Sequence, residues 1–260
     1  MTAAPLILMT GAAGQLATML RPVLAAHGHQ VRLSDARRVA PAFPGESFVA
    51  ARLERAAAMR RACRGAQTLL HLGGVSRDEM WGSLIAANVT GTATCLEEAR
   101  AAGITRIVFA SSLHVLGMHP RHASIDENSP PAPDSRYGVT KLFGEGLCRL
   151  FADKYGLSVT VIRIGHAVAD LTKAAPGQGI SHADLARVVL LALARDTPGF
   201  AMLHAVAPHD GYPLSDGRLA ANFGFTFADH GPSAQAIFDR MDSEPDAANR
   251  HFRGGDFAAH

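Results

Sequence analysis

The segment that decides the fold reads TGAAGQLA and runs from Thr10 to Ala17. A short apolar run precedes it at residues 6–9, and apolar residues follow it at helical spacing over residues 16–27. This pattern predicts a buried strand, a tight turn and a helix. Small residues at positions 11, 14 and 17 permit the turn, close approach of a ligand to the backbone and close helix packing. Free N–H groups at the start of the helix can then bind a pyrophosphate, which is typical of a dinucleotide site.

Strands and helices alternate through the first two thirds of the chain. Further strands are predicted at residues 31–33, 48–49, 68–72, 107–109 and 158–164, and further helices at residues 56–63, 80–102 and 137–155. Because the links are short, we predict an α/β fold with a doubly wound, Rossmann-type parallel sheet. Beyond residue 165 only residues 184–194 have a clear helical pattern. We therefore expect a dinucleotide-binding domain with the catalytic residues at 1–165, and a small substrate-binding and lid region at 166–260.

Composition excludes several classes of protein. Hydrophobic residues make up 48% of the 260 residues and charged residues 18%, which allows a large core and excludes intrinsic disorder. The net charge is +2 and the basic residues are scattered, so no nucleic-acid partner is expected. The three cysteines form no CxxC pair and predict free thiols. There is no signal-peptide pattern and no apolar run of membrane-spanning length, so we expect a cytoplasmic protein without a membrane partner.

An acidic residue at the end of the second strand bears on the cofactor. Asp35 lies about 20 residues beyond the glycines, where a carboxylate can accept a hydrogen bond from a ribose 2′-hydroxyl. The same charge would repel a 2′-phosphate, so the sequence favours NAD over NADP. Arg37 and Arg38 follow directly, and a nearby arginine is what accommodates that phosphate, so NADP stays the alternative.

A tyrosine and a lysine stand four residues apart at the start of a predicted helix. Tyr137 and Lys141 therefore share one helix face. A nearby positive charge lowers the pKa of a phenol, and both the lysine and an oxidised nicotinamide can supply that charge. Ser112 ends the strand just upstream, where its hydroxyl can hold a substrate oxygen while the tyrosine takes the proton. The alternative interpretation is a surface tyrosine and lysine on an amphipathic helix.

Together these motifs resemble the extended short-chain dehydrogenase/reductase family, also described as NAD-dependent epimerases and dehydratases. The motifs that carry the resemblance are Thr10-Gly-x-x-Gly14, Leu72-Gly-Gly74, Asn88, Ser111-Ser112, Tyr137-x-x-x-Lys141 and Arg163-Ile-Gly165. Within the family, bacterial uronate dehydrogenases are the most similar. That similarity rests on TGAAGQL at 10–16, HLGGVS at 71–76, IVFASS at 107–112 with His114, YGVTK at 137–141 and FRGGDF at 252–257.

The resemblance implies roles for individual residues. Tyr137 would be the general base, Lys141 would lower its pKa and hold the nicotinamide ribose, and Ser112 would orient the substrate hydroxyl. The expected cofactor contacts are Gly11, Ala13, Gly14, Gln15, Leu16, Asp35, Leu53, Leu72, Gly73, Gly74, Asn88, Tyr137, Lys141 and Ile164. The expected substrate contacts are Ser76, Ser112, Leu113, His114, Tyr137 and His166.

The chain departs from the uronate enzymes at several positions. Leu113 stands where they have asparagine, and His166 stands where they have serine. The segment that carries their carboxylate-binding arginine reads LTKAAPG at 171–177, with Lys173 as its only cation. Arg52 replaces the acid that reads the adenine amine. The resemblance therefore implies the hydride chemistry, whereas uronate specificity does not follow from it.

We predict an NAD-dependent oxidoreductase that acts on a secondary alcohol or lactol, such as a sugar acid or a related hydroxy compound. The alternatives are a sugar epimerase or dehydratase, for which the C-terminal region is short, and a non-catalytic dinucleotide sensor, which would not need Tyr137 and Lys141. The histidines fit no metal-ligand spacing, so no metal is expected. Helices at 80–102 and 137–155 resemble those that form dimer interfaces in the family, which implies a homo-oligomer.

Overall fold

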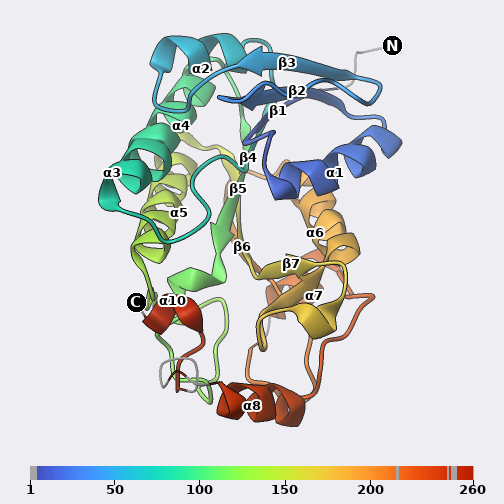
Figure 1. Ribbon diagram of the computed structural model, residues 1–260. Coiled ribbons are helices and arrows are strands. Elements are labelled where there is room, and N and C mark those ends of the chain that lie inside the picture. Colours follow the sequence, from blue (N-terminus) through green and yellow to red (C-terminus); the bar gives the residue numbers. More distant parts are fainter. Residues whose placement is uncertain (1–4, 215–216, 245, 247–250, 260) are drawn as a thin grey trace. The chain divides into compact units, whose positions relative to one another are not determined.

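A computed structural model describes residues 5–214, 217–244, 246 and 251–259. Its main sheet has seven strands in the order β3-β2-β1-β4-β5-β6-β9 (Figure 1). The strands are β1 Leu6–Thr10, β2 Gln30–Asp35, β3 Glu46–Ala50, β4 Thr68–His71, β5 Arg106–Ser112, β6 Ser158–Ile164 and β9 Gly199–Ala205. The pairings from β3 through β5 are all parallel. The predicted doubly wound fold is thus confirmed.

The order of strands places a topological switch point at β1. The chain runs outward from β1 through β2 to β3, then returns to pair β4 on the other side of β1. Ligands of doubly wound sheets bind beyond the carboxyl ends of the strands at such a point. The glycine-rich turn after β1 and the Leu72–Gly74 turn after β4 follow those two strand ends.

Six helices lie close to the predicted ranges, namely α1 Gln15–Ala26, α2 Ala56–Cys63, α3 Trp81–Leu84, α4 Gly91–Ala101, α5 Arg136–Tyr155 and α6 His182–Ala194. Three more helices were not predicted, namely α7 Gly217–Phe223, α8 Ala234–Ser243 and α10 Asp256–Ala259. The single helix expected at 80–102 is wrong in one respect, because a π-helical segment, Ile85–Thr90, separates α3 from α4. Among the described residues no helix has the length and apolar character to cross a membrane.

The chain forms two compact units that interleave along the sequence. The first unit comprises residues 1–110, 143–161 and 192–201, and the second comprises 111–142, 162–191 and 202–260. The predicted domain boundary at residue 165 is a different division of the chain and stays a prediction. In the first unit β4 is buried along its whole length, as parallel strands covered on both faces are. Its three cysteines, Cys63, Cys95 and Cys148, are buried thiols outside any disulfide bond, as predicted.

The second unit has a small core of its own. It contains a separate two-stranded parallel sheet of β7 His166–Val168 and β8 Gly179–Ser181, which the sequence did not indicate. Short 3₁₀ turns lie at Leu113–Val115, directly after β5, and at Leu171–Lys173, between β7 and β8. The apolar side chains that pack together there are Leu113, Leu116, Ile125, Val206, Tyr212, Leu214, Ile237 and Met241. This cluster joins the end of β5 to helix α8 and so orders the last third of the chain.

Candidate active site

The glycine-rich turn of the first unit has a close-packed backbone. Gly11 has a φ of +70°, and a Cβ there would lie 2.7 Å from the Cα of Gly73, so only glycine fits. The N–H of Gly14 donates to the carbonyl of Gly11 at 2.9 Å, and α1 begins at the next residue. The turn therefore brings the start of α1 against the Leu72–Gly73 backbone and leaves the first helical N–H groups open to an anion.

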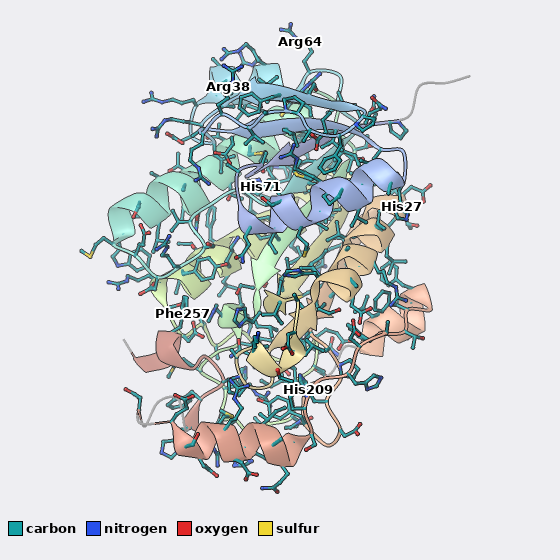
Figure 2. All side chains as sticks on the ribbon, turned by 45° about the vertical axis from the view of Figure 1, so that its right-hand side comes forward. His27, Arg38, Arg64, His71, His209 and Phe257 are labelled. Atoms are coloured by element: carbon teal, nitrogen blue, oxygen red, sulfur yellow. The ribbon has the colours of Figure 1, made fainter. Side chains whose placement is uncertain are left out.

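A buried histidine contacts the residue that precedes this turn. His71, labelled in Figure 2, ends β4, and its Nδ1 lies 2.7 Å from the hydroxyl of Thr10. Its Nε2 lies 3.2 Å from the hydroxyl of Thr92 on α4. Both ring nitrogens thus have partners inside the core, which is how a buried histidine is tolerated. The arrangement fixes the ends of β1 and β4, from which the two glycine turns start.

A cleft of about 420 Å³ opens beside the turn within the first unit. Its lining includes predicted cofactor residues, namely Gly11, Gly14, Gln15, Leu16, Asp35, Leu53, Leu72, Gly73 and Gly74, together with Ser76. Asn88, another predicted cofactor residue, does not itself line the cleft but binds the backbone of Val75, which does. Its amide oxygen accepts from the N–H of Val75 at 2.7 Å, and its amide nitrogen donates to the carbonyl of Val75 at 3.0 Å. The π-helical segment therefore positions the loop that follows β4.

Asp35 is held in place by backbone groups. Its Oδ2 accepts from the N–H of Ala13 at 3.0 Å, and its Oδ1 accepts from the N–H of Arg37 at 2.9 Å. The guanidinium of Arg37 donates to the carbonyl of Ala13 at 2.7 Å, whereas Arg38 is exposed at the surface (Figure 2). Each carboxylate oxygen keeps lone pairs for a further donor. The carboxylate is thus oriented and can accept from a ribose hydroxyl.

The three predicted catalytic residues come together in the second unit. Ser112 ends β5, Tyr137 lies in the first turn of α5, and Lys141 lies one turn further along the same face. All three are buried, with exposed fractions of 6–7%. The ammonium nitrogen of Lys141 is 5.6 Å from the centroid of the Tyr137 ring. The side chain of Ser112 interacts with the phenol of Tyr137 through a hydrogen bond.

The pKa of Tyr137 differs from the expectation. Burial raises the pKa of this phenol from 10.0 to about 12, against the opposing effect of the hydrogen bond with Ser112. The negative charge of Asp134 raises the pKa further. The expected lowering of the Tyr137 pKa is therefore absent in the protein without cofactor. Loss of water destabilises the phenolate more than the hydrogen bond with Ser112 stabilises it.

Two residues that the sequence did not indicate complete this cluster. Asp134 accepts a hydrogen bond from Ser135 at 2.7 Å, and its other oxygen lies 2.8 Å from Nδ1 of His114. The ring of Phe257, labelled in Figure 2, stacks on His114 with centroids 3.8 Å apart. The imidazole is thereby held on two sides, and it meets the ring of Tyr137 edge-on at 5.8 Å. Asp134 lies in a proline-rich loop, which gave no sequence signal for this role.

Asp134 also explains two glycines. A Cβ at Gly117 or at Gly254 would overlap the Asp134 carboxylate, so both positions must lack a side chain. The N–H of Gly254 donates to the carbonyl of Gly117 at 2.8 Å, which seats the C-terminal segment over the carboxylate. Of the two, Gly254 belongs to the FRGGDF segment, which therefore carried a sequence signal for a close backbone approach.

The other predicted substrate residues have varied surroundings. His166 is exposed, and its Nδ1 accepts from the N–H of Ala175 at 3.0 Å, so the ring supports the loop after β7. Leu113 is buried in the apolar cluster of the second unit. The side chain of Lys173 is 79% exposed, with its ammonium 3.9 Å from Asp170. The only cation of the segment at 171–177 is thus a solvated surface group.

Comparison with known proteins identifies the family. The model of the NAD dependent epimerase/dehydratase family matches residues 7–183, which is more than half of the chain. The chain belongs to this family. The match includes both the glycine-rich turn and the Ser112, Tyr137 and Lys141 cluster, so the family assignment rests on the segments that form both sites.

Within the epimerase/dehydratase family, uronate dehydrogenases are similar over nearly the whole chain. That of Pseudomonas syringae pv. tomato is 32% identical over 259 residues, covering 97% of this chain and 93% of the relative. A uronate dehydrogenase from Agrobacterium tumefaciens, a mutant complexed with NAD, has a TM-score of 0.88 at 30% identity and covers 99% of this chain and 98% of its own. A glucuronic acid dehydrogenase from Chromohalobacter salexigens has a TM-score of 0.87 at 31% identity, covering 98% and 97%.

Proposed function

We propose that the protein is an NAD-dependent dehydrogenase that oxidises the secondary alcohol or lactol of a sugar acid. The observation that carries the proposal is the buried cluster of Ser112, Tyr137 and Lys141 in the second unit. The similarity of the whole chain to uronate dehydrogenases supports the substrate class.

The chemistry assigned to the chain is removal of a proton. The Ser112 hydroxyl holds the substrate oxygen, and the Tyr137 phenolate takes the proton from it as the C–H bond gives up its electron pair and a C=O bond forms. NAD, when bound, supplies the hydride acceptor and a positive charge. With a pKa of about 12, Tyr137 in the protein alone is protonated at neutral pH, so the reaction depends on positive charge near the phenol. Because the Lys141 ammonium is already present at that pKa, the additional charge would come from NAD when it is bound.

The cleft of the first unit fits the cofactor. Its turn offers helix N–H groups to a pyrophosphate, and Asp35 offers an oriented carboxylate to a ribose. We assign NAD rather than NADP on that charge. The remaining proposed contacts come from Ala13 at the turn, Asn88, Ile164 and the Tyr137–Lys141 pair.

Substrate contacts are proposed for Ser76, Ser112, Leu113, His114 and His166. The division into a cofactor domain at 1–165 and a substrate and lid region at 166–260 also stays a proposal, as does a cytoplasmic location. A homo-oligomer is supported by three exposed apolar side chains. They are Met80, just before α3, Trp81, its first residue, and Ile85, the first residue of the π-helical segment.

The test is NADH formation, followed at 340 nm, with NAD and a panel of galacturonate, glucuronate and neutral sugars. Turnover that falls by about 10²- to 10⁴-fold in Tyr137→Phe, at an unchanged melting temperature, supports the dehydrogenase. Binding of NAD without turnover of any alcohol would instead support a sensor. Conversion of a nucleotide sugar without net NADH would support an epimerase or dehydratase.

A further inference from the structure

The imidazole of His114 has one hydrogen-bonded edge and one open edge. Its Nδ1 lies 2.8 Å from Oδ2 of Asp134. Within the part of the chain that the structure describes, no group forms a hydrogen bond with its Nε2, and 19% of the side chain is exposed. The ring stacks on Phe257 and meets the ring of Tyr137 edge-on, with centroids 5.8 Å apart. The open edge thus belongs to an imidazole that adjoins the proposed general base.

The carboxylate of Asp134 determines which ring nitrogen of His114 carries the proton. A carboxylate only accepts hydrogen bonds, so Nδ1 of His114 must be the donor in this pair. In a neutral imidazole, the usual form of histidine above about pH 7, the other nitrogen then keeps a lone pair. The open edge of His114 is therefore an acceptor. It suits the hydroxyl of a ligand, whereas a carbonyl or carboxylate oxygen would find no donor there.

The Asp134 carboxylate is fixed by its neighbours. Its side chain has no exposed surface, and its Oδ1 accepts a hydrogen bond from the hydroxyl of Ser135 at 2.7 Å. On the other side, the backbones of Gly117 and Gly254 approach so closely that a Cβ at either position would overlap the carboxylate. The side chain therefore has little freedom to rotate, and Oδ2 stays directed at His114.

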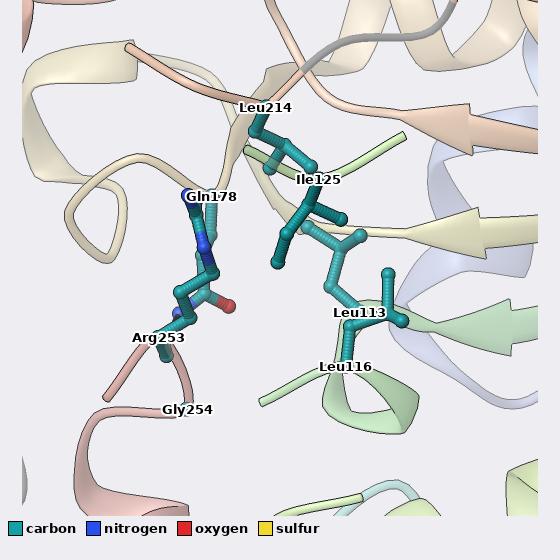
Figure 3. A pocket seen from close by; sticks show the side chains of 7 residues that line it. All are labelled: Leu113, Leu116, Ile125, Gln178, Leu214, Arg253 and Gly254. Atoms are coloured by element: carbon teal, nitrogen blue, oxygen red, sulfur yellow. Dashed lines mark hydrogen bonds between the residues drawn. The ribbon is translucent and has the colours of Figure 1, made fainter. Parts of the chain in front are cut away.

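The turn that carries His114 also holds the catalytic serine. The N–H of His114 donates to Oγ of Ser112 at 3.2 Å, and the carbonyl of His114 accepts from the N–H of Asp134 at 3.2 Å. Figure 3 shows Leu113 and Leu116, on either side of His114 in the chain, in the apolar wall of a small cavity. This packing anchors the turn. Asp134 thus contacts both the backbone and the ring of the residue that binds Ser112.

We propose that Asp134 is a positioning residue, which keeps the proton of His114 on Nδ1 so that Nε2 accepts a hydrogen bond from a hydroxyl of the substrate. This hydroxyl is a neighbour of the one that Tyr137 deprotonates, because the two rings adjoin. The inference rests on the proposed function and adds a basis for selectivity. The site favours a vicinal diol over the analogue without the second hydroxyl, since that analogue leaves Nε2 without a donor.

The first measurement is the tautomer of His114. A two-bond ¹H–¹⁵N correlation spectrum of the ¹⁵N-labelled protein at about pH 8.5 shows which ring nitrogen carries the proton, and the signals of His114 are those lost in His114→Asn. We expect Nδ1–H in the wild type and Nε2–H in Asp134→Asn. In that variant the amide oxygen keeps accepting from Ser135, whose own oxygen accepts from the N–H of Gly138 at 3.0 Å. The amide nitrogen then faces Nδ1 of His114 and can only donate.

The second measurement is kcat/KM with galacturonate and NAD. His114→Asn keeps an amide donor for Asp134 but has no atom in place of Nε2. We expect kcat/KM to fall about 10- to 100-fold in Asp134→Asn and in His114→Asn. The double variant should lie within about threefold of the weaker single variant, since both changes remove the same hydrogen bond. The matched control is Asp184→Asn, another fully buried carboxylate of the second unit, which should leave the tautomer and kcat/KM unchanged.

Deoxy analogues identify the hydroxyl. In the wild type, removal of the hydroxyl beside the reacting carbon should lower kcat/KM about 10- to 100-fold. In His114→Asn the same removal should lower kcat/KM at most about threefold, because the acceptor is already absent. An equal loss in both proteins would contradict a contact between this hydroxyl and Nε2.

Several other results would overturn the proposal. One is Nε2–H in the wild type, and another is Nδ1–H that persists in Asp134→Asn. A third is a pair of losses in kcat/KM that multiply in the double variant, because Asp134 would then act through general packing. If Asp134→Asn does not fold, the wild-type spectrum and His114→Asn decide. An unchanged kcat/KM in His114→Asn would then refute the contact.

The tautomer and a binding measurement separate this inference from the proposed function. If no variant forms NADH from any sugar, the dehydrogenase proposal fails, whereas the spectrum needs neither substrate nor turnover. In the presence of NADH, galacturonate should raise the melting temperature of the wild type more than that of His114→Asn. The proposal for Asp134 fails if the wild type shows Nε2–H, or if galacturonate stabilises neither protein or both equally.

Discussion

Lys141 should set the pH range in which the protein works as a dehydrogenase. Its ammonium nitrogen lies 5.6 Å from the ring centroid of Tyr137. At an effective dielectric constant of about 20, one unit charge at that distance stabilises a phenolate by about 3 kcal/mol. Since about 1.4 kcal/mol corresponds to one pKa unit, Lys141→Met should raise the apparent pKa of the proton acceptor by about 2.

The assay is the pH dependence of kcat for NADH formation at saturating NAD and sugar acid. The reaction requires the deprotonated phenol, so the rate rises tenfold per pH unit below the apparent pKa. Removal of the positive charge moves this rising limb to higher pH. On the limb, Lys141→Met should therefore be about 100-fold slower than the wild type, and the deficit should shrink as the pH approaches the new pKa.

Lys141→Arg is the matched control because it keeps the charge while changing the shape of the donor. It should leave the position of the limb nearly unchanged, even where its maximal rate falls. A loss in Lys141→Met that is equal at every pH from about 6 to 10 would refute the electrostatic reasoning. The lysine would then act by holding the cofactor ribose alone.

Two further substitutions test the proposed cofactor cleft and the packing around Asp134. Asp35→Asn should raise KM for NAD about 10- to 100-fold, because it removes a charged hydrogen-bond acceptor. It should also reduce the preference for NAD over NADP, because the repulsion of a 2′-phosphate is lost. KM values for both cofactors test this, and an unchanged preference would contradict it. Gly117→Ala should lower the melting temperature by several degrees, since its Cβ overlaps the Asp134 carboxylate, whereas Gly146→Ala in α5 meets open space and should be neutral or slightly stabilising; equal melting temperatures would argue against the packing described around Asp134.

The part of the fold that the sequence predicted is the part with simple periodicity. The bounds of α2 and β6 agree with the predicted ranges, because each is a short segment with one clear pattern and clear ends. The π-helical segment Ile85–Thr90 could not be predicted, since apolar spacing hardly distinguishes it from α-helix. The segment also makes a tertiary contact that the spacing does not reveal, the pair of hydrogen bonds between Asn88 and the backbone of Val75.

The last third was harder to predict because its elements are short. β7 and β8 have three residues each, too few for an alternation to emerge, and they are ordered by contacts with distant segments. The N–H of His166 donates to the carbonyl of Gln178, and the side chain of Gln178 reaches Arg253. Such pairings depend on three-dimensional neighbours that spacing does not reveal.

The candidate site divides in the same way. Residues recognised by motif, such as Tyr137 and Lys141, lie where local helix geometry puts them. Asp134 belongs to an irregular segment, and its role depends on its burial, which a single sequence does not reveal. Buried charges are rare and usually paired, so a buried carboxylate needs partners. Asp134 has two, because its carboxylate lies 2.8 Å from Nδ1 of His114 and accepts a hydrogen bond from Ser135.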